Sequence, residues 1–523
     1  MQYLLSFSAQ EFVNFRELEV RSLLQLNDLD QGCIAADVDW SEPYILVKCP
    51  NDEKANKLIE RSVLIKSVYS IWAQASTFGE VLDKIGSVPK KLMEPFISGP
   101  APIKVQVTSV NKKTSQEDRL DYIKRLLSTD KDITAPISLK SPEYELYLLF
   151  DYTRSLTNQK DQKLKQVYYG RLVGESSRRR LMSKFDLSKR TYLGNTTMDV
   201  RLAGIIANAC LASRGDLVWD PFLGTGGMVL ATSVWGAYGA GCDIDYSLVH
   251  GKGRSPKAGQ GKRMEGECLR ANYRQYGLEP YYLDVIIADA ASLGRLLRVP
   301  EERLLLATAS PTTAVDANQK QGQEQSQVTA VGLFDAIITD PPYGVRERSC
   351  RIAGQAAEKE PSLVTPEFLE KITDGAHHPV VVNQDGLVPV THDLPHFPHK
   401  EVYPLQESFS NLLTISVRLL KPQGRLVFWV PVDRNTYSGP ESLPSHPRLK
   451  LVTVCEQALN NRVSRFLMVM EKLPPCDADF DLTRVRSTET GDVSCAESWG
   501  KDVAFHLDNF RNAYFKPKKL RNG

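Results

Sequence analysis

Residues 220–227 read Asp220-Pro221-Phe222-Leu223-Gly224-Thr225-Gly226-Gly227, directly after the apolar residues LVW and before an apolar run with helical spacing. A strand, a glycine turn and a helix in this order bring backbone amides and the positive end of a helix close to a ligand. A dinucleotide-binding loop has the pattern G-x-G-x-x-G, but its third glycine would fall on Val229 here. The carboxylate of Asp220 would also repel a pyrophosphate, whereas it suits the ammonium group of a methionine moiety.

The next two predicted strands also lead into acidic residues. The strand at 238–243 ends at Asp243, with Asp245 two residues later, where a carboxylate can accept hydrogen bonds from ribose hydroxyls. The strand at 283–288 is followed by Asp289, which can reach an adenine amino group. Three carboxylates in succession at strand ends, lining one crevice, predict a site for S-adenosylmethionine (SAM). Within the glycine turn, the expected cofactor contacts are Phe222, Gly224, Thr225 and Gly226.

The fourth predicted strand, FDAIIT at 334–339, runs directly into Asp340-Pro341-Pro342-Tyr343. Two prolines stiffen the chain and remove two backbone donors, which leaves carbonyl oxygens exposed. The Asp340 carboxylate and the Pro341 carbonyl can each accept one hydrogen of an amino group and so direct its lone pair at a methyl sulfonium. Tyr343 can stack on a flat base that is unpaired or has left its helical stack. Asp340, Pro341, Pro342 and Tyr343 are therefore the predicted catalytic motif of an amino methyltransferase.

Strands alternate with helices from about residue 191 to residue 475, which predicts an α/β fold with a doubly wound, Rossmann-like parallel sheet. The last two strands, expected at 449–458 and 465–473, are joined by a short loop. This pair predicts an antiparallel hairpin at one edge of the sheet. Such a hairpin is unusual in dinucleotide-binding sheets and usual in SAM-dependent ones.

The rest of the chain divides by composition. Residues 1–170 alternate short strands and amphipathic helices and predict an α+β region of one or two small subdomains. Residues 171–190 carry seven Arg or Lys against two acids and are interpreted as a basic linker. Insertions into the α/β domain are expected at 250–264, 308–330 and 346–404, and residues 476–523 form a tail of unassigned role.

Composition narrows the class of protein. The chain has no apolar run long enough to span a bilayer and no secretory leader at its start, and its nine cysteines form no C-x-x-C pair. A cytoplasmic protein without a structural zinc site is therefore expected. The net charge of +2 argues neither for nor against a nucleic acid, so RNA binding has to rest on local basic clusters. Five histidines between 377 and 399 lack helical metal-ligand spacing, and no metal is expected.

These motifs resemble those of the tRNA guanine-10 N2-methyltransferase family over most of residues 1–475. Beside DPFLGTGG and DPPY, the similarity is densest in KRTYLGNTTMD at 189–199, DIDY at 243–246 and NYRQYG at 272–277. The resemblance implies an N-terminal ferredoxin-like region with an RNA-binding THUMP domain. It also implies a Rossmann-like domain that forms N2-methylguanosine in tRNA, at position 10. It adds Thr197 to the expected cofactor contacts. The RNA-binding residues expected in the basic linker are Arg178, Arg179, Arg180, Lys189 and Arg190.

The resemblance also implies a partner, a small zinc-binding activator protein that forms a heterodimer with the catalytic chain. The third strand of such a sheet lies at an edge, and its sequence Leu283-Asp284-Val285-Ile286-Ile287 is apolar enough to need covering. A local loop and the partner protein are equally good candidates for this cover.

Four interpretations compete. The first is methylation of the guanine N2 amino group in tRNA; an aspartate at position 340, which can also take up the released proton, favours guanine in RNA over adenine in DNA. The second is an amino methyltransferase for N2 of guanine in ribosomal RNA or for N6 of adenine. The third is a catalytically silent RNA-binding subunit, and the fourth is a dinucleotide-dependent oxidoreductase. The intact residues Asp220, Gly224, Gly226, Asp340 and Tyr343 argue against the third.

Overall fold

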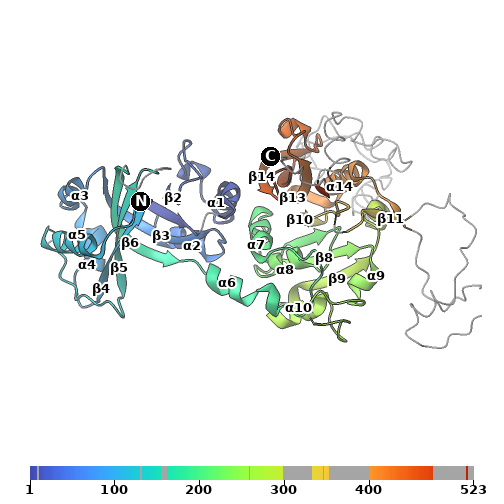
Figure 1. The fold of residues 1–523 in the computed structure, drawn as a ribbon, viewed down its shortest axis with the longest axis horizontal. Helices are drawn as coiled ribbons and strands as arrows, with labels where there is room; N and C mark the ends of the chain where they lie inside the picture. Colours follow the sequence, from blue (N-terminus) through green and yellow to red (C-terminus); the bar gives the residue numbers. More distant parts are fainter. Residues whose placement is uncertain are drawn as a thin grey trace, which may run out of the picture.

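The computed structural model describes residues 1–8, 11–129, 132–154, 162–257, 259–297, 332–345, 347–352, 400–474, 510, 514 and 515. The chain forms an N-terminal α+β region and a larger α/β domain, which lie side by side (Figure 1). The expected insertion at 308–330 lies outside the described residues, as do 353–399 of the insertion expected at 346–404. Of the tail after residue 475, only Phe510, Tyr514 and Phe515 are described.

A six-stranded sheet in the order β2-β1-β3-β6-β5-β4 runs through the whole N-terminal region. Its strands are β1 (Gln2–Phe7), β2 (Tyr44–Lys48), β3 (Ile65–Ala75), β4 (Ile103–Val110), β5 (Tyr144–Tyr152) and β6 (Leu164–Glu175). The long strands β3 and β6 pair antiparallel along most of their length and so connect the two halves of the sheet. The apolar face of one half packs on α1 (Arg16–Leu26) and α2 (Asp52–Glu60). That of the other half packs on α3 (Phe78–Ile85), α4 (Lys90–Ile97) and α5 (Gln116–Thr129).

Capping residues explain where these helices begin. The side chain of Asn51 accepts a hydrogen bond from the amide of Lys54 at 2.9 Å and caps α2, while Thr77 caps α3 through the amide of Glu80. Strand β1 and helix α1 were not predicted from the sequence. The charged Glu19 lies on the buried face of α1 and interrupts its apolar stripe, so the helical pattern of this segment is weak in the sequence.

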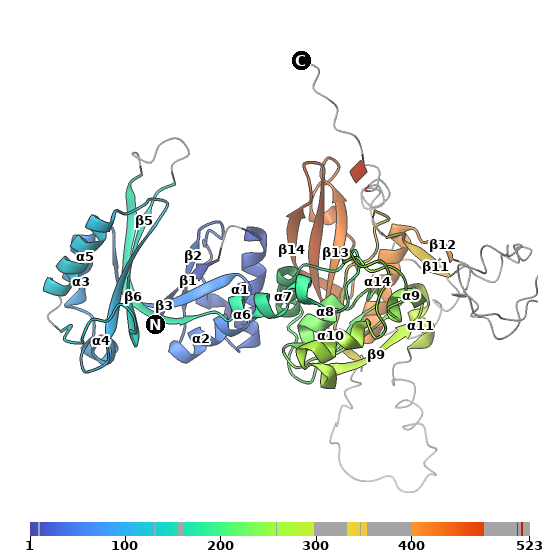
Figure 2. The ribbon, with the colours of Figure 1, turned by 60° about the horizontal axis from the view of Figure 1, so that its bottom comes forward.

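The segment 171–190 is more structured than a linker. Its first five residues belong to β6, where Glu175 pairs with Ser67 of β3, and a helix α6 (Arg178–Lys184) follows. Five consecutive residues of β6, 167–171, are buried, so this strand continues across the boundary predicted at residue 170. Helix α6 lies between the two parts of the chain (Figure 2).

The α/β domain contains a seven-stranded sheet in the order β14-β15-β13-β10-β7-β8-β9. The strands are β7 (Leu217–Asp220), β8 (Tyr238–Asp243), β9 (Tyr282–Ile287), β10 (Phe334–Thr339), β13 (Leu420–Asp433), β14 (Leu449–Ala458) and β15 (Val463–Lys472). The first five are parallel, and β15 runs antiparallel between β13 and β14. The expected terminal hairpin is thus present at one edge, and the expected third strand, β9, is the opposite edge.

Helices cover both faces of this sheet, which makes it doubly wound. One face packs on α7 (Val200–Ala209), α8 (Gly227–Ser233) and α10 (Leu269–Tyr276). The other packs on α11 (Leu293–Leu296) and α14 (Leu405–Leu419). Neighbouring residues of one strand, such as Val218 and Trp219 of β7, belong to different cores because side chains alternate across a strand. A short helix, α9 (Tyr246–Val249), follows β8, and a separate two-stranded ribbon pairs β11 (Cys350–Ile352) with β12 (Lys400–Val402).

The N-terminal region is fastened to the α/β domain at the C-terminal end of α7. The buried Glu19 of α1 accepts a hydrogen bond from Asn208 of α7 at 2.9 Å. Arg61 donates to the same Asn208 at 2.8 Å and to the carbonyl of Ala212 at 2.9 Å. Because α1, α2 and α7 share one apolar core, the two parts bury a continuous surface against each other. No helix in the described part of the chain is long and apolar enough to cross a membrane.

Candidate active site

The glycine turn lies between β7 and α8 and adopts a conformation that requires glycine. Gly224 has φ +54° and Gly226 has φ +68°, both in the left-handed region that other residues rarely adopt. A Cβ atom on Gly226 would lie 2.5 Å from Cδ1 of Leu269 on α10, so the turn is also closely packed. The backbone of this turn is therefore held at the carboxyl end of β7, where a ligand of an open α/β sheet binds.

Asp220 is completely buried at the end of β7. Its Oδ1 accepts hydrogen bonds from Oγ1 of Thr339 at 2.8 Å and from the amide of Phe222 at 3.0 Å. Its Oδ2 has no hydrogen-bond partner among the described residues. Burial, with smaller contributions from Asp243 and Asp340, raises the pKa of Asp220 from 3.8 to about 7. A buried carboxylate with a free oxygen fits a positively charged group such as the ammonium of SAM.

Asp243 supports the glycine turn from the neighbouring strand β8. Its Oδ2 accepts from the amide of Gly224 and its Oδ1 from the amide of Asp245, both at 2.8 Å. Each carboxylate oxygen has two lone pairs, so both oxygens can still accept a ribose hydroxyl. Asp245 caps α9 by accepting from the amides of Ser247 and Leu248. It is exposed, so its side chain also remains accessible to a ligand.

Asp289 is buried after β9 and already has a partner on each oxygen. Oδ1 accepts from the amide of Ala291 at 2.9 Å, and Oδ2 accepts from the amide of Ile352 in β11 at 2.7 Å. The carboxylate thereby ties the ribbon β11–β12 to the end of the sheet. Contact with an adenine amino group, as predicted for Asp289, would use its remaining lone pairs.

Thr197 lies against the glycine turn, as a cofactor contact should. Its Oγ1 is 2.9 Å from Oγ1 of Thr225, and it accepts from the amide of Gly194 at 2.8 Å. The half-buried Phe222 follows Asp220 at the start of the same turn. Every cofactor residue predicted between 197 and 245 thus lies on or beside this turn, whereas Asp289 lies farther along the sheet, after the edge strand β9.

The motif Asp340-Pro341-Pro342-Tyr343 leaves β10 on the opposite side of the switch point from the glycine turn. Strand order reverses between β7 and β10, and ligands of doubly wound sheets bind at such points. The bond from Thr339 to Asp220 joins the ends of these two strands. The glycine turn and the catalytic motif therefore open on the same edge of the sheet, as methyl transfer between them requires.

Asp340 is held by Arg465, which was not predicted from the sequence. Nη1 of Arg465 donates to Oδ2 of Asp340 at 2.8 Å, while Oδ1 is buried and has no partner among the described residues. Burial raises the pKa of Asp340 to about 6 although Arg465 lowers it, and Glu347 adds a smaller increase. Glu347 also accepts a hydrogen bond from Thr196 at 2.5 Å. Arg465 and Asp340 are 125 residues apart in the chain, so no local sequence pattern predicts that they pair.

Tyr343 is half-buried and contacts the C-terminal tail. Its ring lies 5.9 Å from that of Phe510 in an edge-to-face arrangement, and both pack with Val463 at the start of β15. Phe510 is 1% exposed, although no role was assigned to the tail from the sequence. The hydroxyl of Tyr343 has no partner within the described residues.

The five basic residues predicted to bind RNA are placed differently from one another. Arg179 and Arg180 of α6 and Lys189 are exposed, whereas Arg178 donates to the carbonyl of Val63 at 2.7 Å. Arg190 is only 4% exposed, so the prediction that it contacts RNA is not supported. A phosphate cannot reach a guanidinium that is covered by the packing of Phe185 and Tyr276.

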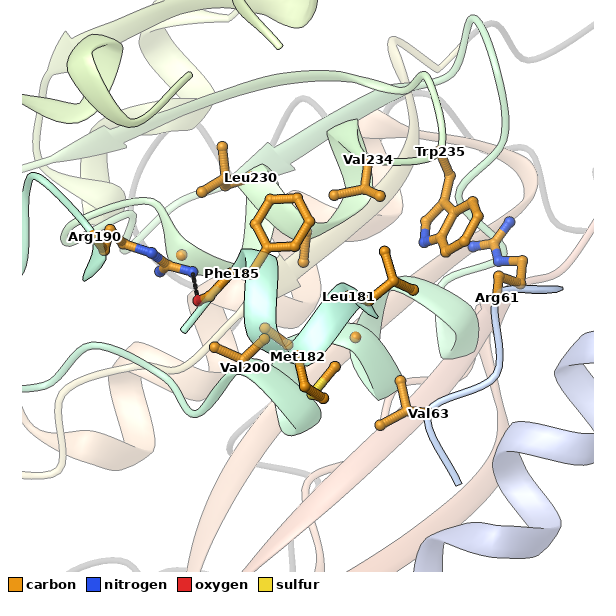
Figure 3. A pocket seen from close by; sticks show the side chains of 14 residues that line it. Arg61, Val63, Leu181, Met182, Phe185, Arg190, Val200, Leu230, Val234 and Trp235 are labelled. Carbon is orange, nitrogen blue, oxygen red and sulfur yellow. Dashed lines mark hydrogen bonds between the residues drawn. The ribbon is translucent and has the colours of Figure 1, made fainter. Parts of the chain in front are cut away.

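Arg190 instead lines an apolar pocket between the two parts of the chain (Figure 3). Leu181, Met182 and Phe185 of the α6 segment point into this pocket, and Leu230 and Val234 of the α8 segment face them. Its apolar lining identifies it as part of the packing between α6 and the α/β domain. Among the described residues, no three His, Cys, Asp or Glu side chains gather as a metal site would require, and the histidines of 377–399 lie outside that part.

The order of the seven strands, the inserted antiparallel β15 and the acidic strand ends facing an Asp-Pro-Pro-Tyr motif define a Rossmann-like methyltransferase. The model of the Tmrp11 THUMP N-terminal domain matches residues 1–178. The tRNA (guanine(10)-N(2))-methyltransferase TRMT11 of Xenopus laevis is 34% identical over 519 residues, covering 98% of this chain and 91% of that protein. The human protein of the same name is 32% identical over 472 residues, which cover 90% of this chain and 88% of the human protein.

This chain belongs to the tRNA (guanine(10)-N(2))-methyltransferase TRMT11 family, which confirms the resemblance found in its sequence. Among solved structures, the crystal structure of TrmN from Thermus thermophilus covers 90% of this chain and all of that protein, with 15% identity and a TM-score of 0.38.

Proposed function

We propose that this chain transfers a methyl group from SAM to the N2 amino group of a guanine in tRNA, at position 10. The relatives that share most of its length carry this activity in their names. One observation of the structure carries the proposal: the free oxygen of Asp340 and the glycine turn lie on the same edge of the sheet, joined by Thr339.

The residues of the site fit SAM. Asp220 offers a free carboxylate oxygen for the ammonium group, Asp243 offers lone pairs for the ribose, and the glycine turn allows close approach to the backbone. When bound, SAM supplies an activated methyl group on a positively charged sulfur. The carboxylates of Asp220, Asp243 and Asp340 also favour this positive charge electrostatically.

The reaction at the base depends on Asp340 and Pro341. An exocyclic amino group is conjugated with its ring and is a poor nucleophile. Acceptance of its two hydrogens by Oδ1 of Asp340 and the carbonyl oxygen of Pro341 favours tetrahedral nitrogen and directs the lone pair at the methyl group. Oδ1 of Asp340 then takes the proton that the nitrogen loses on methylation, and Tyr343 stacks on the base.

Residues 1–170 would hold the tRNA, residues 191–475 would carry out the reaction, and 171–190 would connect them. The match of the N-terminal family model supports the first assignment. On the connecting segment, the exposed side chains of Arg179, Arg180 and Lys189 are placed to contact phosphates.

A small zinc-binding activator protein would cover the edge strand β9. Leu283, Ile286 and Ile287 expose 47%, 42% and 45% of their surface there, and an uncovered apolar edge invites pairing with another chain. A cytoplasmic location would suit the cysteines, because those that the structure describes are free thiols, as expected in a reducing compartment.

The test is to incubate the full chain, co-expressed with such a partner, with methyl-labelled SAM and, in separate reactions, tRNA or ribosomal RNA, and to identify the modified nucleoside by mass spectrometry. N2-methylguanosine from position 10 is expected. A labelled adenosine, or labelling of ribosomal RNA only, would point to the second interpretation, and no label to a silent RNA-binding subunit. Asp340→Ala should lower methyl transfer by at least about 100-fold while SAM and tRNA still bind. Comparable activity in this variant would remove the role given to Asp340.

A further inference from the structure

Among the residues that the structure describes, Arg465 is the cation that pairs with Asp340, and its guanidinium has further contacts. Arg465 lies on β15, a strand that reaches the motif only because it inserts antiparallel beside β13. Its side chain is 15% exposed, its Nη1 donates to Oδ2 of Asp340 at 2.8 Å, and its Nε donates to Gln457 at 2.7 Å. The guanidinium also lies over the ring of Trp429, 4.1 Å from the centroid.

This clamp makes the two oxygens of Asp340 different. Oδ2 is occupied by Arg465, whereas Oδ1 is shielded from solvent and has no donor among the described residues. A buried acceptor without a donor is unfavourable in the free protein, and the loss is recovered when an amino group arrives. The clamp therefore selects the oxygen that meets the substrate.

We propose that Arg465 is a positioning residue for methyl transfer, which fixes Asp340 with Oδ1 directed at the target amino group and keeps the carboxylate ionised. This inference rests on the proposed function and deepens it, because Arg465 acts through Asp340 and does not itself touch the reacting atoms. The ring of Trp429 supports the guanidinium of Arg465. Phe15 of the N-terminal region packs against Trp429 in turn, with 6.0 Å between ring centroids.

The charges around Asp340 make Arg465 necessary. Glu347 and Asp220 are the acidic groups that interact with Asp340, and burial also disfavours its ionised form. Arg465 is the opposing positive charge that lowers the pKa of Asp340. Without Arg465, the carboxyl of Asp340 would hold its proton to a higher pH, and a protonated carboxyl cannot take up the proton that the amino group releases.

The experiment compares Arg465→Gln and Arg465→Lys with the wild-type chain in single-turnover methylation of tRNA across pH 5.5–9. Arg465→Gln should lower the rate at pH 7 by about 100-fold and move the acidic limb of the pH–rate profile upward by about one pH unit or more. Arg465→Lys keeps the charge but loses the forked geometry, so it should recover most of the pH profile with a rate about three- to tenfold below that of the wild type. The affinity for SAM, measured by calorimetry, should change by less than about threefold in both variants.

Arg434→Gln is the matched control, because it removes an exposed arginine directly after β13 that pairs with Glu456 at 3.2 Å. It should behave as the wild type. An unchanged rate and pH profile in Arg465→Gln would overturn the inference, as would an equal loss of SAM binding and of rate. If Arg465→Gln does not fold, Arg465→Lys decides alone. A reduced rate with a wild-type pH profile in Arg465→Lys supports the inference, and an unreduced rate in Arg465→Lys overturns it. Absence of methylation by the wild-type chain would instead refute the proposed function.

Discussion

Replacement of Asp220 with asparagine is expected to stabilise the fold and to weaken the binding of SAM at the same time. Asp220 is fully buried, and its pKa rises from 3.8 to about 7 on folding. A carboxyl with a raised pKa favours folding while it is protonated, and this contribution is lost as the pH rises from about 4 to about 7. At 1.36 kcal/mol for each pH unit, ionised Asp220 destabilises the folded chain by about 4 kcal/mol at pH 8.

Asparagine has nearly the same shape and no charge, so it can keep the bonds from Thr339 and Phe222 through its Oδ1. The gain is expected to be largest at pH 8 and to fall to about 2 kcal/mol at pH 5, where the wild-type carboxyl is protonated in the folded chain. Since 1 kcal/mol shifts the Tm of a domain of 150–250 residues by about 2–4 °C, a gain of about 4 kcal/mol should raise the Tm by about 8–16 °C at pH 8. Loss of the charged partner of the ammonium group should weaken SAM binding by about 10- to 100-fold.

Thermal unfolding of both proteins at pH 5 and pH 8, with calorimetric titration of SAM at pH 8, checks this prediction. The exposed Asp83 of α3 provides the control, because Asp83→Asn should alter neither quantity. A Tm for Asp220→Asn that is equal to or below that of the wild type at both pH values would refute the argument from burial. Unchanged affinity for SAM would refute the contact with the ammonium group.

Two further predictions concern the glycine turn and the edge strand. Gly226→Ala should lower SAM affinity at least about tenfold and reduce the Tm, because φ +68° and the contact with Leu269 both oppose a Cβ. Gly79→Ala on α3 is the control and should be neutral, because a Cβ there meets no atom within 4 Å. Equal behaviour of the two variants would contradict the packing argument. Ile286→Lys should abolish co-purification with the small zinc-binding partner, whereas Leu139→Lys, at a position 76% exposed in the N-terminal region, should retain it. Retention of the partner by Ile286→Lys would show that it binds elsewhere.

The elements that carry the site could be predicted because their signals are local. Strands β7, β8 and β10 were predicted at their observed bounds, since each is a short apolar run that ends in an acidic or proline residue. The apolar spacing also predicted helices, which lie within a few residues of α7, α8, α10 and α14: 200–212, 227–235, about 265–276 and 407–420. The antiparallel pair at the end of the domain was also predicted, because two apolar runs joined by a short loop have few other ways to pair.

Contacts between distant segments could not be predicted in this way. Arg465 lies 125 residues after Asp340 and meets it only because β15 inserts beside β13. Arg190 was predicted on the RNA surface because charge usually marks exposure, yet Phe185 and Tyr276 bury it. Phe510 belongs to a tail without a recognisable pattern, and its contact with Tyr343 follows from the position of the β10 end.

The amino-acid sequence alone therefore determined the chemistry that is available: a glycine turn, three strand-end carboxylates and an Asp-Pro-Pro-Tyr motif, all readable within windows of a few residues. The tertiary structure decided which oxygen of Asp340 is free and which basic residues are exposed. The physical reason is that periodicity and turn chemistry act between near neighbours in the chain. Burial and charge pairing, in contrast, depend on strand order, which brings together residues that are more than a hundred positions apart.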